Sequence, residues 1–241
     1  MPRNDATPTL RSIRAEFRPL GDAAIAEHSA RFFKTGKGEY GEGDRFLGIR
    51  VPVTRKIARR FRNTSLRTTL ALLKSAYHEE RLLAVLMLVD MFERGDEETR
   101  ARVIDAYLAN TRYINNWDIV DSSAHKIVGA WLETRDRAAL DVLAASESLW
   151  ERRIAMMATY HFIRGGDFDD ALRIAKQLLD DDEDLIHKVT GWMLREIGNR
   201  DRNALEAFLG RHYRDMPRTM LRYAIEKLPE RRRRAYLDGR I

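Results

Sequence analysis

Residues 78–92 read HEERLLAVLMLVDMF, a pattern that indicates a buried helix. Leu82, Val85, Leu86 and Val89 recur at the three- and four-residue spacing of one helix face. The longest unbroken apolar run in this stretch has eight residues, far fewer than the ~20 that a membrane-spanning helix needs. We therefore expect a soluble protein whose core is built from helices of this kind.

Similar helices recur along the chain at an interval of about 35 residues, and strand and hairpin signals are nearly absent. The apolar helices are expected to start near His78, Asn115, Leu149, Asp184 and Pro217. Shorter amphipathic helices are expected between them, over 97–108, 138–144, 168–179 and 202–213. A repeat of paired helices is typical of an all-α α-solenoid, and a HEAT-like stack fits better than a tetratricopeptide or ankyrin array. We expect a single HEAT-like repeat domain over residues 1–241.

The composition excludes several kinds of site and favours some classes of protein. The chain has no cysteine, which excludes disulfides, a thiol nucleophile and cysteine-ligated metal. Its 35 arginines outnumber eight lysines, and the formal net charge is +6. This excess fits a nucleic-acid binder, but a GC-rich genome also enriches arginine. The first 18 residues lack the apolar region of a signal peptide, so we expect a cytoplasmic protein.

A solenoid bends into a concave groove, because each repeat is rotated slightly against its neighbour. A curved groove that carries many arginines has the shape and charge to hold a DNA duplex, but the same architecture would equally suit a protein-binding scaffold. One glycine-rich segment, 34–44, interrupts the helical pattern. It lacks both a preceding strand and the Gly-Lys-Ser/Thr ending of a P-loop. It is either a mobile loop beside the groove or a linker before the helix expected at Val51.

The most unusual pair of residues is Trp117 and Asp121, which lie four positions apart and share one helix face. In a purely structural interpretation, Asn115 or Asn116 caps the helix, Asp118 interacts with the helix dipole and Trp117 belongs to the core. That interpretation accounts for Asp118 but not for Asp121, which lies beyond the first turn. A functional role for the pair is the alternative.

Two later segments place comparable residues in the next repeats, Trp-Glu-Arg-Arg at 150–153 and Lys-Val-Thr-Gly-Trp at 188–192. Arg153 and Lys188 are expected near a groove-lining edge. The structural alternative puts the two tryptophans in the core and Arg152 on a solvated face.

No histidine pair has the spacing of a zinc site, and a serine close to His125 on one helix cannot form a hydrolase triad. We therefore expect no histidine-ligated metal site.

Four segments carry a resemblance to a known family: 46–52, 117–121, 150–153 and 191–192. In order and spacing they resemble the AlkD-type DNA alkylation repair glycosylases, over roughly residues 25 to 230. The resemblance implies a monomer that binds duplex DNA on a concave basic face. It implies base excision repair in which the N-glycosidic bond of cationic N3- or N7-alkylpurines is hydrolysed without a metal or cofactor.

The resemblance also implies roles for particular residues. Asp121 matches the catalytic carboxylate, Trp117 and Trp192 the cleft tryptophans, and Arg153 the cleft arginine. We further expect DNA contacts from Lys188, Arg50, Arg152 and Arg222. No lysine is evidently placed for Schiff-base chemistry, so the expected enzyme is monofunctional. The alternative is a non-catalytic HEAT-repeat module that binds DNA structures or a protein partner.

Overall fold

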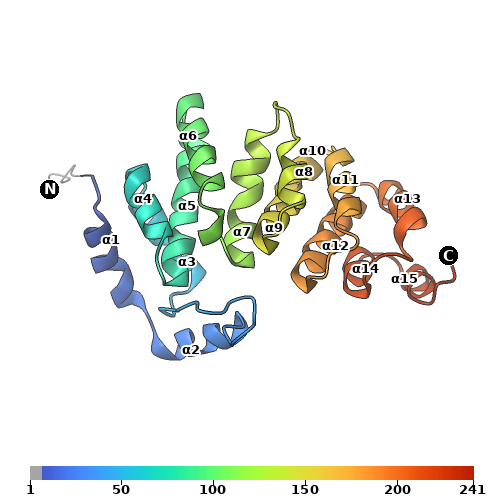
Figure 1. The fold of residues 1–241 in the computed structure, drawn as a ribbon, viewed down its shortest axis with the longest axis horizontal. Coiled ribbons are helices and arrows are strands. Elements are labelled where there is room, and N and C mark those ends of the chain that lie inside the picture. The colour runs from blue at the N-terminus through green and yellow to red at the C-terminus, as the bar shows by residue number, and fades with distance from the viewer. Residues whose placement is uncertain (1–6) are drawn as a thin grey trace. The chain divides into compact units, whose positions relative to one another are not determined.

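The computed structural model describes residues 7–241, and this range contains helices and no strand (Figure 1). The one β-type contact within it is an isolated bridge between Arg45 and Tyr77. The predicted all-α helical-repeat fold is therefore confirmed. Contacts divide the chain into two compact units, Met1–Ser123 and Ala124–Ile241, each with a core of its own. The expected single-domain organisation stays a prediction.

Unit 1 holds the blue-to-green helices of Figure 1. Its elements are α1 (Leu10–Phe17), the 3-10 turn η1 (Arg18–Leu20), α2 (Ala23–Phe32), α3 (Val51–Arg60), α4 (Leu66–Leu73), α5 (His78–Arg94), α6 (Glu97–Leu108), the 3-10 turn η2 (Thr111–Tyr113) and α7 (Trp117–Ala124), whose last residue opens unit 2.

The centre of unit 1 is α5. Every residue from His78 to Val89 is buried, and α3, α4 and α6 all pack against this helix. The sequence predicted one apolar face, and the structure shows burial all round, which includes Leu83, Ala84 and Leu88. A helix enclosed in this way buries whatever side chains its first turn carries, charged ones included.

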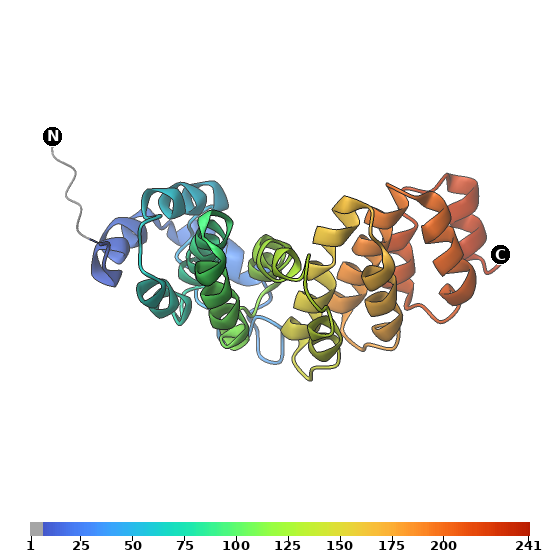
Figure 2. The ribbon, with the colours of Figure 1, turned by 90° about the horizontal axis from the view of Figure 1, so that it is seen from above.

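Unit 2 contains the remaining helices, which follow one another in chain order from yellow to red in both views (Figures 1 and 2). They are the π-helical turn η3 (His125–Gly129), α8 (Ala139–Ala144), α9 (Leu149–Ala158), α10 (Tyr160–Gly165), α11 (Asp169–Gln177), α12 (Asp184–Gly198), α13 (Arg202–His212), α14 (Arg218–Ala224) and α15 (Glu230–Leu237).

The predicted repeat is confirmed by the helix starts. α5, α9 and α12 begin at the expected residues, α7 begins two residues later, and α14 begins one residue after Pro217. The shorter helices also match: α6 has the expected bounds, and α8, α11 and α13 differ from them by two residues or fewer at either end. The structure has no helix long and apolar enough to cross a membrane among residues 7–241.

Two glycines of unit 2 allow neighbouring helices to touch backbone to backbone. A Cβ at Gly191 of α12 would lie 2.4 Å from the carbonyl oxygen of Met220 in α14. A Cβ at Gly129 would lie 2.3 Å from the carbonyl oxygen of Ala158 in α9. Any larger residue would push the helices apart. The glycine of the Gly-Trp pair therefore has a packing role.

Candidate functional site

α7 carries the first two of the expected site residues. It starts at Trp117, because the side-chain oxygen of Asn116 accepts the Trp117 backbone N–H at 2.8 Å and the Asn116 carbonyl accepts Val120 N–H at 3.1 Å. Asn116 is thus the N-cap residue of α7; the sequence had predicted either Asn115 or Asn116 in this place. Trp117 and Asp121 are both half-buried and one turn apart on this helix.

Asp121 lies close to a buried hydroxyl pair in unit 1. The Tyr107 phenol oxygen is 2.8 Å from Ser123 Oγ, and Tyr107 is fully buried. Burial raises the pKa of Tyr107 strongly, and the negative charge of Asp121 raises it further. The Asp121 carboxylate therefore lies near neutral, buried hydroxyl groups. In such surroundings its charge acts through a lower dielectric than in water.

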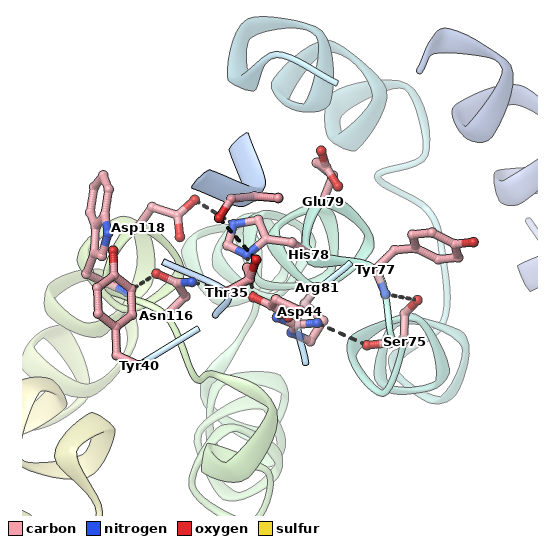
Figure 3. Close-up of polar contacts among 12 residues, drawn as sticks. Thr35, Tyr40, Asp44, Ser75, Tyr77, His78, Glu79, Arg81, Asn116 and Asp118 are labelled. Atoms are coloured by element: carbon pink, nitrogen blue, oxygen red, sulfur yellow. Dashed lines mark hydrogen bonds and ion pairs between the residues drawn. The ribbon is translucent and has the colours of Figure 1, made fainter. Parts of the chain in front are cut away.

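A charged cluster lies beside the first turn of α7 (Figure 3). The His78 imidazole lies between two carboxylates, with Nδ1 3.1 Å from Asp44 Oδ2 and Nε2 2.9 Å from Asp118 Oδ2. Arg81 forms an ion pair with the other Asp44 oxygen and donates to the carbonyl of Ser75 at 3.2 Å. Three segments distant in sequence thus meet at the start of α5.

The cluster fixes the protonation state of its members. Burial disfavours the charged form of His78, but the negative charge of Asp118 and the hydrogen bonds to both carboxylates outweigh it and raise its pKa from 6.5 to about 9. Burial likewise opposes ionisation of Asp44, but its bond to His78 and the charge of Arg81 hold its pKa below the usual value. At neutral pH both ring nitrogens of His78 therefore donate hydrogen bonds.

Aromatic rings surround the imidazole. The rings of Phe33 and Phe46 each lie 4.8 Å from that of His78, centroid to centroid. Phe33 also stacks on Trp117 at 5.3 Å with planes 24° apart, and Phe32, a residue that is 57% exposed, meets the Trp117 indole at 6.0 Å. Trp117 thus belongs to the aromatic cluster that surrounds His78.

The glycine-rich segment is anchored to α5, so it is not a plain linker. Its last residue, Asp44, belongs to the charged cluster. Immediately after it, the buried Glu79 carboxylate accepts backbone N–H groups from Leu47 at 2.9 Å, Gly48 at 2.8 Å and Ile49 at 3.2 Å. The next residue of α5, Glu80, accepts hydrogen bonds from two arginines of the N-terminal segment, Arg14 and Arg18.

In unit 2, Arg153 lies on α9 and is only 4% exposed. It donates to the carbonyl of Leu185 at 2.7 Å, which links α9 to α12. Its neighbour Arg152 is not on a solvated face: it forms an ion pair with Asp181 at 2.5 Å and donates to the carbonyls of Ser146 and Glu147. The expected DNA contact of Arg152 stays a prediction, and the structure gives its guanidinium an internal role.

The other expected residues of unit 2 lie on α12 and α14. Trp192 is half-buried, donates its indole N–H to Glu196 at 3.3 Å and lies 6.3 Å from the Tyr160 ring, so it is not a core residue. Lys188 forms an ion pair with Asp184 at 2.7 Å. Arg222 is exposed on α14.

Arg50, the N-cap residue of α3 in unit 1, is also exposed. Within residues 7–241 the structure gives neither Arg50 nor Arg222 a hydrogen bond or ion pair through its side chain, so both can contact phosphate without breaking an internal bond. Among the same described residues, no group of three histidine or acidic side chains could hold a metal ion.

Comparison with known proteins assigns the family. The sequence matches the family described as DNA alkylation repair enzyme over residues 13–228. The chain belongs to this family. A solved structure titled as a predicted DNA alkylation repair enzyme from Enterococcus faecalis has a TM-score of 0.68 and 16% identity, and covers 88% of this chain and 98% of that chain. At this identity the likeness shows a shared fold. No curated protein sequence matches the chain.

Family membership supports a role in DNA alkylation repair and implies binding to damaged DNA. The sequence pattern excluded zinc-type histidine spacing but did not predict the charged cluster around His78. The available signal was the charged start of α5, His-Glu-Glu-Arg at 78–81, directly before the apolar run. Four polar residues at the entrance of a buried helix require partners, although the sequence does not name them.

Proposed function

We propose that the protein is a monofunctional DNA glycosylase that hydrolyses the N-glycosidic bond of cationic N3- and N7-alkylpurines in duplex DNA. Membership of the DNA alkylation repair enzyme family supports the repair role. The choice of a glycosylase rests on the resemblance of the Trp117 and Asp121 segment to AlkD-type enzymes and on the geometry of α7.

The observation that carries the proposal is the half-buried carboxylate of Asp121 one helical turn from the indole of Trp117. A protein that only binds DNA, a polyanion, gains nothing from a carboxylate in its binding face. A protein that stabilises a cation gains from both groups, because a carboxylate attracts positive charge and an indole face does so through its quadrupole.

The chemistry needs no further group. An alkylpurine that carries a positive charge leaves as a neutral base, because the electron pair of the C1′–N9 bond returns to the ring. The remaining barrier is the oxocarbenium character that develops on the deoxyribose, as in other glycosidic cleavages. Asp121 stabilises that charge and accepts the proton of the attacking water as the water oxygen bonds to C1′. The products are an abasic site and the free base.

The remaining roles extend the same proposal. Trp117 and Trp192 contact the sugar–phosphate backbone around the lesion, and Arg50, Lys188 and Arg222 contact phosphates without reading sequence. Arg153 holds a phosphate beside the lesion, a role that rests on the family resemblance and requires its guanidinium to become more exposed when DNA binds. The DNA-binding form is a cytoplasmic monomer with a basic binding face.

The experiment is release of N7-methylguanine from a defined duplex, in EDTA, by the wild type and by Asp121→Asn. The matched control is Asp105→Asn, an exposed aspartate of α6 in the same unit. We expect the Asp121 variant to be at least about 100-fold slower while it still binds the duplex, as when other groups that stabilise transition-state charge are removed. The control should match the wild type.

Three outcomes would contradict the proposal or part of it. Equal rates for wild type and Asp121→Asn would remove the role of Asp121. Duplex binding without release by the wild type would show a non-catalytic DNA-binding module. Strand scission without heat or base would contradict the monofunctional assignment.

A further inference from the structure

The first turn of α7 is tied to α5 through the side chain of Asp118. This residue directly follows Trp117, and its Oδ2 lies 2.9 Å from His78 Nε2. Asp118 is 14% exposed and His78 is 2% exposed, so water competes little for this bond. The bond therefore connects the helix that carries Trp117 and Asp121 to the most deeply packed helix of unit 1.

The imidazole at the other end of this bond cannot turn. Its Nδ1 donates to Asp44, and Asp44 is itself held by Arg81. The rings of Phe33 and Phe46 lie against it at 4.8 Å each. A ring with both nitrogens bonded and two aromatic neighbours keeps one orientation, which is the condition for positioning a neighbouring group to within a fraction of an ångström.

A second route links His78 to Trp117. The Phe33 ring contacts both, with its centroid 4.8 Å from the imidazole and 5.3 Å from the indole, and it is nearly parallel to the indole. His78 therefore acts on Trp117 both through Asp118 in the adjacent backbone position and through the ring of Phe33. Asp121, one turn further along the same helix, moves with that turn.

We infer that His78 is a positioning residue for the Trp117–Asp121 site, which acts by holding the first turn of α7 through Asp118. This inference rests on the proposed function. His78 touches no substrate in this role; it sets the place and angle of the two side chains that do. Misplacement of catalytic groups by about 1 Å costs up to about 100-fold in rate.

The test cuts the link at Asp118 and leaves the deeply buried His78 in place. Asp118→Ala removes the acceptor, whereas Asp118→Asn keeps an oxygen that can accept the His78 Nε2–H. The matched control is Asp169→Ala, which removes an exposed first-turn aspartate from α11 in the other unit. His78→Gln is the second variant, in case Asp118→Ala does not fold by circular dichroism.

Two quantities separate positioning from general damage. The first is the single-turnover rate of N7-methylguanine release, and the second is the dissociation constant for a duplex that carries a tetrahydrofuran abasic analogue. We expect Asp118→Ala to lower the rate about 10- to 100-fold with less than about a threefold change in the dissociation constant. Asp118→Asn should restore the rate to within about threefold of the wild type, and Asp169→Ala should leave both quantities unchanged.

The inference is overturned if Asp118→Ala keeps a rate within twofold of the wild type, or if Asp118→Asn is as slow as Asp118→Ala. A readout independent of activity separates it from the proposed function. The contribution of Trp117 to the near-ultraviolet circular dichroism is the spectrum of a protein minus that of the same protein with Trp117→Phe. This contribution should change in Asp118→Ala and persist in Asp118→Asn. If the wild type releases no base, the proposed function fails, and this spectrum still decides whether His78 fixes Trp117.

Discussion

Replacement of Glu79 by glutamine is expected to destabilise unit 1 by about 2–5 kcal/mol. The Glu79 side chain is buried, and its Oε1 accepts the N–H groups of Gly48 and Ile49 while Oε2 accepts that of Leu47. Glutamine has one acceptor oxygen. In the better of its two orientations it keeps the bonds to Gly48 and Ile49 and turns its own N–H group toward the Leu47 N–H.

The magnitude follows from these contacts. Two hydrogen bonds lose the assistance of a negative charge, which costs about 0.5–1 kcal/mol each, and two opposed donors remain without an acceptor, at about 1–3 kcal/mol. Charge-assisted bonds to backbone N–H groups are about twice as strong as neutral ones, so the loss is larger than for a typical surface substitution.

The assay is urea denaturation at pH 7 followed by circular dichroism, with hydrogen exchange of residues 46–50 as a local probe. Glu98→Gln, an exposed first-turn glutamate of α6, is the control and should lose about 1 kcal/mol or less. In Glu79→Gln the amides of Leu47, Gly48 and Ile49 should exchange faster. A stability loss no larger than that of the control, with unchanged exchange at 46–50, would refute the reasoning.

The His78 pKa of about 9 in the folded state lies above the ordinary 6.5. Protonated His78 therefore contributes about 3 kcal/mol of stability, which is complete below pH 6.5 and is lost as the pH rises through 9. The urea midpoint of the wild type should be lower at pH 9.5 than at pH 6, and this difference should be smaller in His78→Gln. Gly191→Ala should destabilise the folded protein by about 1–3 kcal/mol, because the new Cβ would meet the backbone of α14. Gly210→Ala should stabilise it by about 0.5–1 kcal/mol, because nothing lies within 4 Å of the new Cβ. Calorimetry of both variants measures the two changes. Arg222→Ala should reduce the magnitude of the slope of log K against log salt for duplex binding by about 0.9, whereas Arg137→Ala, which removes a guanidinium paired with Asp167 and Asp170, should leave that slope unchanged.

The fold was predictable because its signals are local. The spacing of Leu82, Val85 and Val89 within one helix, and the recurrence of such helices, depend on neighbours in sequence and on a period of 3.6 residues. All-round burial of α5 was not predictable in the same way, since it depends on which helices pack against it.

The site was predictable only where one helix contains it. Trp117 and Asp121 share α7, so their spacing alone placed them on one face. The cluster around His78 is different, because its carboxylate partners lie 34 and 40 residues away in sequence. Arg152 shows the same limit: Asp181, 29 residues on, binds its guanidinium, and a sequence without tertiary contacts leaves that side chain on the surface.

α2 contributes no buried side chain to the core of unit 1. The segment that follows it is attached to the start of α5 through the carboxylates of Glu79 and Asp44 and through the rings of Phe33 and Phe46. Such a segment has an opening equilibrium of its own, to which its charged contacts contribute alongside its apolar ones. Salt and pH therefore act on this equilibrium while the helical core stays closed. Each opening uncovers the face of Trp117 that Phe33 otherwise shields, so solvent conditions tune how the indole is presented without any change in the repeats themselves.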